Sequence, residues 1–354
     1  MSKVIPHSKP FVSEEDALAV AKVVKSGMHA TWKKTEEFEN KISELIGINY
    51  GKAVTSGTTA LHIALLGLGV TNEDEVIIPS YVCQSLLNAV NYIGAKAVLA
   101  DIDPDYKDKG YNISARTVKN LINIKTKAII VPHMFGIPAE INEIVNLGVS
   151  VIEDCCQSLG AMNEGRVTGS FGKIGVFSFY ATKVISTGHG GMVVTNCEDV
   201  KEKFYDLNKY DGRDEYKIAF NYGFTDIQAA LGLNQLQRLN EFIERRREIG
   251  KRYDKAFSDI GLRIPPNNKG SFPFRYVINL KNKDELERAL VVLREIGIKA
   301  EKPVFKPLHR YLGKDDSIFP NTSEAHETAL SIPIYPALND DEVEYIIRNV
   351  LEVF

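Results

Sequence analysis

Apolar and polar positions up to about residue 155 alternate between a helical and a strand period. Residues 14–25 place apolar side chains at helical spacing behind Ser13, a plausible N-cap, and residues 38–46 repeat the pattern before Gly47. Further helices are predicted over 58–69, 84–94, 115–122 and 139–148, and short apolar strands over 75–80, 95–103, 127–133 and 149–154. Strands that alternate with single helices predict a parallel sheet built from right-handed crossovers.

The alternation of single helices and strands ends in the second half of the chain. Residues 175–179 and 191–195 form two apolar runs separated by a short loop, which predicts antiparallel strands at one end of the sheet. Residues 226–257 are mostly helical, and their charge run is typical of a solvated helix face. The Pro-rich stretch 264–274 is interpreted as a linker.

The C-terminal part contains a strand, a helix over 283–296 and a last amphipathic segment, which together predict a small α+β domain. We therefore expect a large domain over 1–245, including the N-terminal segment, and a small domain over 246–354. The 354 residues are enough for both cores.

Composition excludes several classes of function. Lysine and arginine number 43 against 46 acidic residues, so charge gives no reason to expect a nucleic-acid partner. No apolar run is long enough to cross a bilayer and no signal or transit pattern is visible, so a cytoplasmic protein is expected, with no membrane partner. The four cysteines lack zinc-type spacing and the seven histidines are scattered, so no metal is expected.

Three segments carry candidate chemistry. The turn around Ser56, Gly57 and Thr58 enters a helix, where free N–H groups and hydroxyls suit a phosphate, although an ordinary N-cap is the simpler interpretation. Asp154 ends a buried strand, the usual position of ligands in open α/β sheets, and needs a cationic partner there. Lys183 lies in a small, Gly-rich loop after a strand, where a nucleophilic lysine is possible and a solvated one is the alternative. A phosphate cradle, an anion and an amine are what pyridoxal 5′-phosphate (PLP) requires of a protein.

With these residues in place, the chain resembles the DegT/StrS group of sugar aminotransferases, which are fold-type I PLP enzymes. The resemblance covers nearly the whole chain and implies an α/β fold with a mainly parallel seven-stranded sheet flanked by helices. The segments that carry it are IPHSKPFVSEED, SGTTALHIALLGLG, DEVIIPS, ADIDPD, PHMFGIPAEI, VIEDCCQSLGA, GSFGKIGVFSFYATKVISTGHGGMVVT, NYGFTDIQAALGLNQLQRL and LSIPIYPALNDDEV.

The resemblance also implies roles for individual residues. Lys183 would hold PLP as a Schiff base and move the proton between substrate and cofactor. Asp154 would pair with the pyridinium nitrogen, and Gln157 would lie near the phenolic oxygen. The activity implied is amination of a nucleotide-linked keto-sugar, with glutamate as amino donor and a ping-pong mechanism.

The phosphate of the cofactor would be held by Gly57, Thr58 and Ser178. Asn221 would reach the cofactor phosphate of a neighbouring subunit, which implies a homodimer with shared active sites. For the donor's carboxylate the sequence offers only Arg213 as a guess.

The chain departs from the family pattern at three places. Cys83 stands where an aromatic residue usually stacks on the ring, so either this thiol or nearby Tyr81 would face the ring. The loop after the lysine has His189 where the family has glutamate, and Gly223 replaces a common arginine. The last two changes bear on the substrate rather than on the Schiff-base chemistry.

Other interpretations remain open at this level. A PLP-dependent dehydratase on the same fold is a rival, but the relatives of this kind lack the lysine that Lys183 supplies. A non-enzymatic regulator or scaffold is a second rival, against which the intact site residues argue. His62 is interpreted as a packed core residue, whereas His133 and His309 are hypotheses for substrate contacts.

Overall fold

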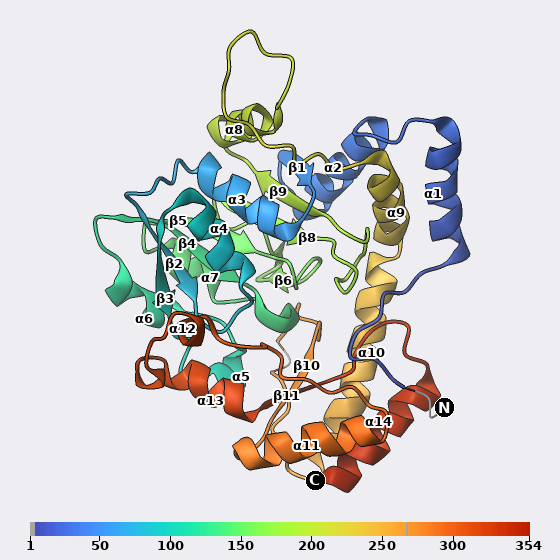
Figure 1. Cartoon of the computed structure of the whole chain (residues 1–354). Coiled ribbons are helices and arrows are strands. Elements are labelled where there is room, and N and C mark those ends of the chain that lie inside the picture. Colours follow the sequence, from blue (N-terminus) through green and yellow to red (C-terminus); the bar gives the residue numbers. More distant parts are fainter. Residues whose placement is uncertain (1–3, 267) are drawn as a thin grey trace.

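The computed structural model describes residues 4–266 and 268–354 and is organised around a seven-stranded sheet (Figure 1). Residues 1–3 and 267, which belong to the expected N-terminal segment and linker, lie outside the described part. In spatial order the strands are β1 (Tyr50–Val54), β9 (Gly191–Thr195), β8 (Ile174–Ser178), β5 (Ser150–Asp154), β4 (Thr126–Pro132), β2 (Glu75–Pro79) and β3 (Lys96–Ala100).

The sheet is mainly parallel, as predicted. Neighbouring strands from β8 to β3 pair in parallel, whereas β9 runs antiparallel to both β8 and β1. The predicted antiparallel pair is therefore confirmed, with Ser178 opposite Gly191. Strand β1 was not predicted from the sequence, because its residues show no alternation of apolar and polar side chains. It is defined by its pairing with β9.

Both faces of the parallel strands are covered, which explains their uninterrupted apolar runs. In β2, Ile78 packs in a cluster with residues of α3 (Gly57–Gly67) and α4 (Ser85–Ile93). Its neighbour Ile77 belongs to a second cluster, with residues of α6 (Ala115–Val118) and α7 (Ile141–Val145). Adjacent side chains of a strand thus enter separate cores.

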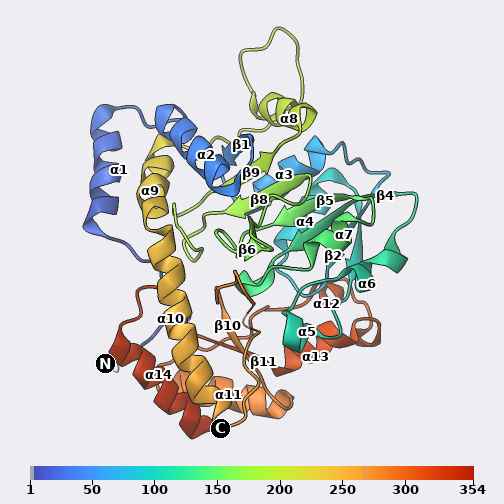
Figure 2. The ribbon, with the colours of Figure 1, turned by 180° about the vertical axis from the view of Figure 1, so that it is seen from behind.

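The N-terminal and central helices pack beside the β1 end of the sheet. Helix α9 (Asp226–Gln237) contacts α1 (Glu14–Ser26) and α2 (Lys33–Ile46), as Figures 1 and 2 show from opposite sides. The predicted helical stretch 226–257 is two helices, since α10 (Leu239–Ser258) begins after a break at Arg238. The proposed domain boundary after residue 245 falls inside α10.

The C-terminal part has a core of its own, formed with α10. Its strands β10 (Tyr276–Asn279) and β11 (Ala329–Ile332) pair antiparallel, next to α11 (Lys283–Glu295) and α14 (Asp340–Val353). The N-terminal segment joins this part, since the N–H of Ile5 donates to the carbonyl of Gly297 (2.8 Å).

The remaining elements are short or peripheral. They are α5 (Tyr106–Lys109), η1 (Lys119–Leu121), η2 (Met134–Gly136), β6 (Met162–Asn163), β7 (Arg166–Val167), α8 (Glu198–Asn208), α12 (Leu308–Tyr311), η3 (Asp316–Ile318) and α13 (Pro320–Thr328). Among the described residues, every helix is too short or too polar to cross a membrane.

Candidate active site

The candidate residues gather where the parallel strands end. Asp154 is the last residue of β5, Ser178 is the last of β8, and Gly57 is the first of α3. Strands β5 and β8 are neighbours in the sheet, and α3 packs against β8 and β9. This edge is the one at which open α/β sheets bind their ligands.

Glycine allows the N-terminus of α3 to approach this edge closely. A Cβ placed on Gly57 would lie 2.9 Å from Cβ of Ser178 and 3.2 Å from Sγ of Cys156. A Cβ on Gly191, which pairs with Ser178, would lie 2.2 Å from the carbonyl oxygen of Ser56. A side chain at either glycine would therefore fill the cradle that a phosphate needs or push the helix away.

The turn before α3 is both a helix cap and a possible phosphate cradle. The N–H of Thr59 donates to Oγ of Ser56 (3.1 Å), and the N–H of Ser56 donates to Oγ1 of Thr59 (2.9 Å), which forms a capping box. Both hydroxyls are thus used inside the turn. Within the described chain, the N–H groups of Gly57 and Thr58 have no such acceptor and stay open to a ligand.

Asp154 is a buried carboxylate at the end of β5. Its Oδ1 accepts a hydrogen bond from the N–H of Cys156 (3.0 Å), and none of the ion pairs between described residues includes it. A buried carboxylate without a cation is costly. The protonated ring nitrogen of PLP is a group that fits this need.

Gln157 is oriented by the turn after β4. Its Oε1 accepts a hydrogen bond from the N–H of Phe135 (2.9 Å), and Phe135 has a left-handed backbone with φ of 60°. Because a backbone N–H requires an acceptor, the amide oxygen faces Phe135 and the Nε2 group is left to donate elsewhere. This donor suits an oxygen substituent on the cofactor ring.

Lys183 follows a turn in which its N–H donates to the carbonyl of Tyr180 (2.8 Å). Its Nζ lies 5.6 Å from the centre of the Phe274 ring, and no ion pair of the described residues holds it. Burial raises the pKa of the Cys156 thiol, the charge of Asp154 raises it further and that of Lys183 opposes both. The lysine and the aspartate therefore lie within electrostatic range of one thiol.

The two residues considered for the ring face have different surroundings. Tyr81 is completely buried, stacks on Tyr111 at 5.5 Å between ring centres, and donates to the carbonyl of Ala325. Cys83 is exposed and lies within electrostatic range of Cys156. The geometry therefore favours Cys83 over Tyr81 as the residue next to a bound ring.

Asn221 and Arg213 both belong to the segment between α8 and α9, part of which Figure 1 shows projecting from the body of the molecule. Asn221 is exposed, and Nη1 of Arg213 pairs with Oδ1 of Asp206 (2.6 Å). In the same segment Tyr222 contacts His62, which is buried among aromatic rings, as its interpretation as a packed residue requires.

The backbone of His133 adjoins the candidate site, since its N–H donates to the carbonyl of Asp154 (3.1 Å), but the side chains of His133 and His309 are not free to bind a substrate. Both are fully buried. Nδ1 of His309 lies 2.7 Å from Oγ of Ser80 and its Nε2 lies 2.9 Å from Asp316, while His133 pairs with Glu153. Their hydrogen-bonding capacity is used inside the fold rather than toward a substrate.

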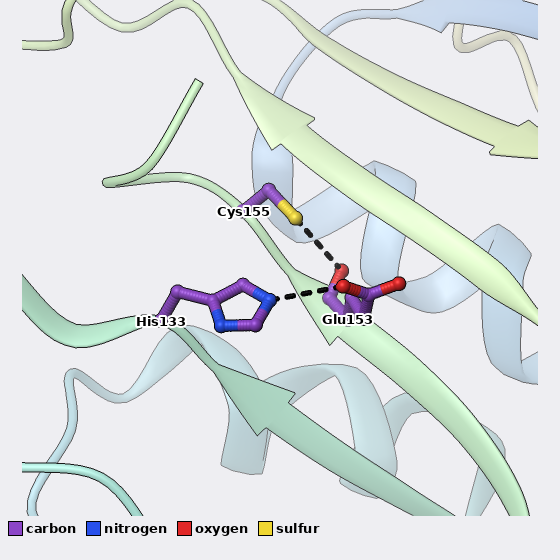
Figure 3. Close-up of side chains that lie close together, drawn as sticks. All are labelled: His133, Glu153 and Cys155. Atoms are coloured by element: carbon purple, nitrogen blue, oxygen red, sulfur yellow. Dashed lines mark hydrogen bonds and ion pairs between the residues drawn. The ribbon is translucent and has the colours of Figure 1, made fainter. Parts of the chain in front are cut away.

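His133, Glu153 and Cys155 form a buried cluster whose three possible ligand atoms lie within 4.8 Å of one another (Figure 3). Nδ1 of His133 accepts from the N–H of Ala139 (3.0 Å), so Nε2 carries the hydrogen and donates to Oε2 of Glu153 (3.0 Å). Burial also raises the pKa of the Cys155 thiol well above its usual value. A protonated nitrogen and a neutral thiol are poor ligands, so we interpret the cluster as structural.

Sequence reasoning missed Phe274 and Arg275 next to the candidate site. Phe274 is the last residue of the expected linker and Arg275 lies between it and β10, in a stretch without a recognisable motif. An arginine before a strand is ordinarily solvated, and only the packing shows that this one is largely enclosed. In the sequence, the only indication of this site was that Arg275 stands between two aromatic residues.

One protein family and several known proteins resemble this chain over nearly its whole length. The family described as DegT/DnrJ/EryC1/StrS aminotransferase matches residues 10–351. A GDP-perosamine synthase of Escherichia coli O157:H7 is 32% identical, over 99% of both chains. The aminotransferase TlmJ of Streptoalloteichus hindustanus superposes with a TM-score of 0.92 at 30% identity, over 99% of this chain and 98% of TlmJ. The putative sugar aminotransferase Spr1654 of Streptococcus pneumoniae in its PMP form gives 0.91 at 26% identity, over 99% and 97%, and is also solved in a PLP form.

Proposed function

Because this chain belongs to the DegT/DnrJ/EryC1/StrS aminotransferase family and is a PLP-dependent transaminase, we propose that it aminates a keto-sugar carried on a nucleotide. The relatives named after sugar products or sugar substrates support a sugar acceptor. The fold has the same α/β architecture as these structures over nearly its full length.

The cofactor would be held by the residues described above. Gly57, Thr58 and Ser178 would bind the phosphate, Asp154 would keep the ring nitrogen protonated, and Gln157 would donate to the ring oxygen. When bound, PLP carries the amine between substrates and accepts the electrons of the broken C–H bond.

The protein's own contribution is binding and proton transfer. Lys183 would bind the cofactor aldehyde and then hold the proton that moves between the substrate carbon and the cofactor. The aromatic wall of Phe274, 5.6 Å from Nζ, limits water around this amine. We further propose glutamate as donor and a ping-pong order, in which the keto-acid leaves before the sugar binds.

We also propose that the active enzyme is a homodimer. Exposed Asn221 belongs to the segment between α8 and α9, as do exposed Tyr216 and Ile218. Exposed apolar side chains on such a segment are favourable when a partner covers them. Asn221 would then complete the phosphate site of the other subunit. The four cysteines are free thiols, consistent with action in the cytoplasm.

A single observation carries the proposal. A buried carboxylate and a lysine, both outside any ion pair of the described residues, lie with a glycine cradle at one edge of the sheet. A dehydratase that lacks the lysine does not fit this site, and a scaffold protein has no use for an unpaired buried charge.

The visible absorption spectrum of the purified protein tests the proposal directly. We expect an absorption band at longer wavelength than that of the protein itself. Glutamate should bleach this band, and a nucleotide keto-sugar should restore it. Lys183→Ala removes the amine and should abolish both the band and turnover. Lys173→Ala, an exposed lysine just before β8, is the matched control and should leave the spectrum unchanged. A protein that stays colourless with added PLP would contradict the proposal.

A further inference from the structure

Arg275 carries a positive charge that no carboxylate of the described residues neutralises at ion-pair distance. Its Nη1 lies 3.5 Å from Nδ1 and 3.4 Å from Nε2 of His7. These long and nearly equal distances show that the guanidinium faces the imidazole without a strong bond to either nitrogen. Burial lowers the pKa of Arg275, the expected effect on a cation that is removed from water.

Other arginines of the fold have partners of two kinds, although Nε of the buried Arg246 has none among the described residues. Arg310 pairs with Asp316 (2.7 Å) and Arg252 pairs with Asp340 (2.7 Å), both near the surface. The buried Arg246 donates from Nη1 to two backbone carbonyls, at 3.0 and 2.9 Å. Among the residues that the structure describes, Arg275 has neither a carboxylate nor a carbonyl partner, so its donors remain open to a ligand.

The imidazole beside Arg275 is neutral. His7 is buried, its Nε2 lies 2.9 Å from Oγ of Ser331, and its Nδ1 lies 3.0 Å from Oγ of Ser8. Burial and the charge of Arg275 together lower the pKa of His7 to about 3. The nearest carboxylate, Glu301, is half-exposed and lies 3.8 Å from the imidazole. Arg275 and His7 together therefore carry one positive charge, that of Arg275.

The peptide that carries Arg275 is fixed against the candidate active site. The N–H of Phe274 donates to the carbonyl of Phe135 (3.0 Å), whose own N–H donates to Gln157. The ring of Phe274 lies 5.6 Å from Nζ of Lys183. Cys83, the residue favoured for the ring face, lies within electrostatic range of Arg275. One short segment thus connects this cation to the lysine.

We propose that Arg275, packed against the neutral imidazole of His7, binds a carboxylate of the amino-acid donor. This inference rests on the proposed function, because it assigns one of its two substrates. A planar guanidinium binds a carboxylate through two parallel hydrogen bonds, and the ion pair is strong where water is excluded. The donor must bring its amine to Lys183, and its carboxylate lies beside that amine. Arg213, the residue that the sequence suggested for the donor's carboxylate, already pairs with Asp206.

The donor half-reaction isolates this contact. Holoenzyme is mixed with glutamate in the absence of sugar, and the glutamate concentration for half-maximal bleaching is measured. Arg275→Gln should raise this concentration roughly 10- to 100-fold, the usual effect of losing a hydrogen-bonded charge pair. Arg263→Gln is the control, since it removes an exposed arginine that pairs with Asp108, and should change nothing.

The sugar half-reaction separates a carboxylate from the phosphates of a nucleotide. After the amine has been loaded, recovery of the band by a nucleotide keto-sugar should be the same in Arg275→Gln as in the wild type. If the variant weakens only the sugar step, the subsite binds phosphate and the proposal is wrong. If neither step changes, the proposal is also wrong.

Glutarate, which has two carboxylates and no amine, provides a measurement independent of turnover. It should raise the thermal midpoint of the wild-type holoenzyme and not that of Arg275→Gln. If Arg275→Gln does not fold, Arg275→Lys replaces it in these measurements. Lysine keeps the positive charge but cannot form two parallel hydrogen bonds to a carboxylate. An unchanged glutamate requirement in Arg275→Lys, together with no effect of glutarate on the wild type, would overturn the proposal.

The same experiments distinguish this inference from the proposed function. If glutamate leaves the wild-type spectrum unchanged, the donor half of the proposed function fails, whatever Arg275 does. If the wild type responds and Arg275→Gln responds at the same concentrations, only the assignment of Arg275 fails.

Discussion

Two buried clusters flank the candidate active site, and each combines a histidine with a charged group. In one of them, the Glu153 carboxylate accepts from His133 (3.0 Å) and from the N–H groups of Gly169 (2.9 Å), Phe171 (2.6 Å) and Gly172 (2.6 Å). In the other, Arg275 faces His7 and has no carboxylate of the described residues at ion-pair distance. The charge of Glu153 is fully hydrogen-bonded, whereas that of Arg275 is not.

This difference separates a charge that holds the fold from one that awaits a ligand. Burial alone would raise the pKa of Glu153, but the hydrogen bonds of His133 and of the loop after β7 lower it below its usual value. The carboxylate thereby ties β5, the strand that presents Asp154, to that loop. Arg275 has no such partners, and burial lowers its pKa. A fold retains a destabilised charge where a ligand uses it.

Replacement of Glu153 should have the largest effect on stability. Glu153→Ala leaves four donors without an acceptor, two of them buried and two part-buried, and we expect a loss of about 4 kcal/mol in the free energy of unfolding. Chemical denaturation at fixed protein concentration measures this loss. Glu143→Ala removes an exposed carboxylate of α7 and should stay within about 0.5 kcal/mol of the wild type. Equal stabilities for the two variants would show that the cluster does not support the fold.

The second effect is a pH dependence that originates from His7. Its pKa is about 3 in the folded protein against an ordinary 6.5, so between these values the unfolded chain binds a proton that the folded chain does not. The stabilising contribution is therefore complete above pH 6.5 and is lost as the pH falls toward 3. We expect a slope approaching about 1.4 kcal/mol per pH unit in this window.

The measurement is the free energy of unfolding of the wild type and of His7→Gln across this pH range. Glutamine does not titrate, and its amide retains a hydrogen bond to Ser331. The difference between the two proteins should shrink or reverse as the pH falls from 6.5. Parallel curves would contradict a neutral, buried His7.

Removal of the unpaired cation should have a smaller effect of the opposite sign to that of Glu153→Ala. Arg275→Met keeps the bulk of the side chain and removes a charge without a partner, so we expect the protein without donor to gain about 1 kcal/mol in stability. Denaturation without amino acid measures the gain. A loss as large as that of Glu153→Ala would show that both clusters are structural, and the contrast between them would disappear.

The smallest effect is a change at His7 itself. In Arg275→Met the nearby positive charge is gone, so the pKa of His7 should rise but stay below 6.5, because burial is the larger cause of its depression. Titration of the imidazole by NMR measures the shift. An unchanged pKa would mean that the two side chains do not interact in solution.

Several parts of the molecule could be predicted from the sequence because the signals are local. Apolar strands such as 75–80 and 149–154 alternate with single helices, and that rhythm predicts a parallel sheet. The turn at Gly57, the strand end at Asp154 and the loop of Lys183 were predicted as a set, because each depends on residues adjacent in the chain. Strand β1 was missed because it depends on a partner far along the chain.

The tertiary structure alone decided which charges are satisfied. From the sequence, His133 and His309 were as plausible for substrate contacts as any loop histidine, yet both are buried and bonded. Arg275 and His7 are separated by most of the chain and meet because the N-terminal segment packs against the C-terminal part. Local sequence determines which groups a segment offers, whereas burial and partners depend on packing between distant segments, and these determine the free energy of a charge.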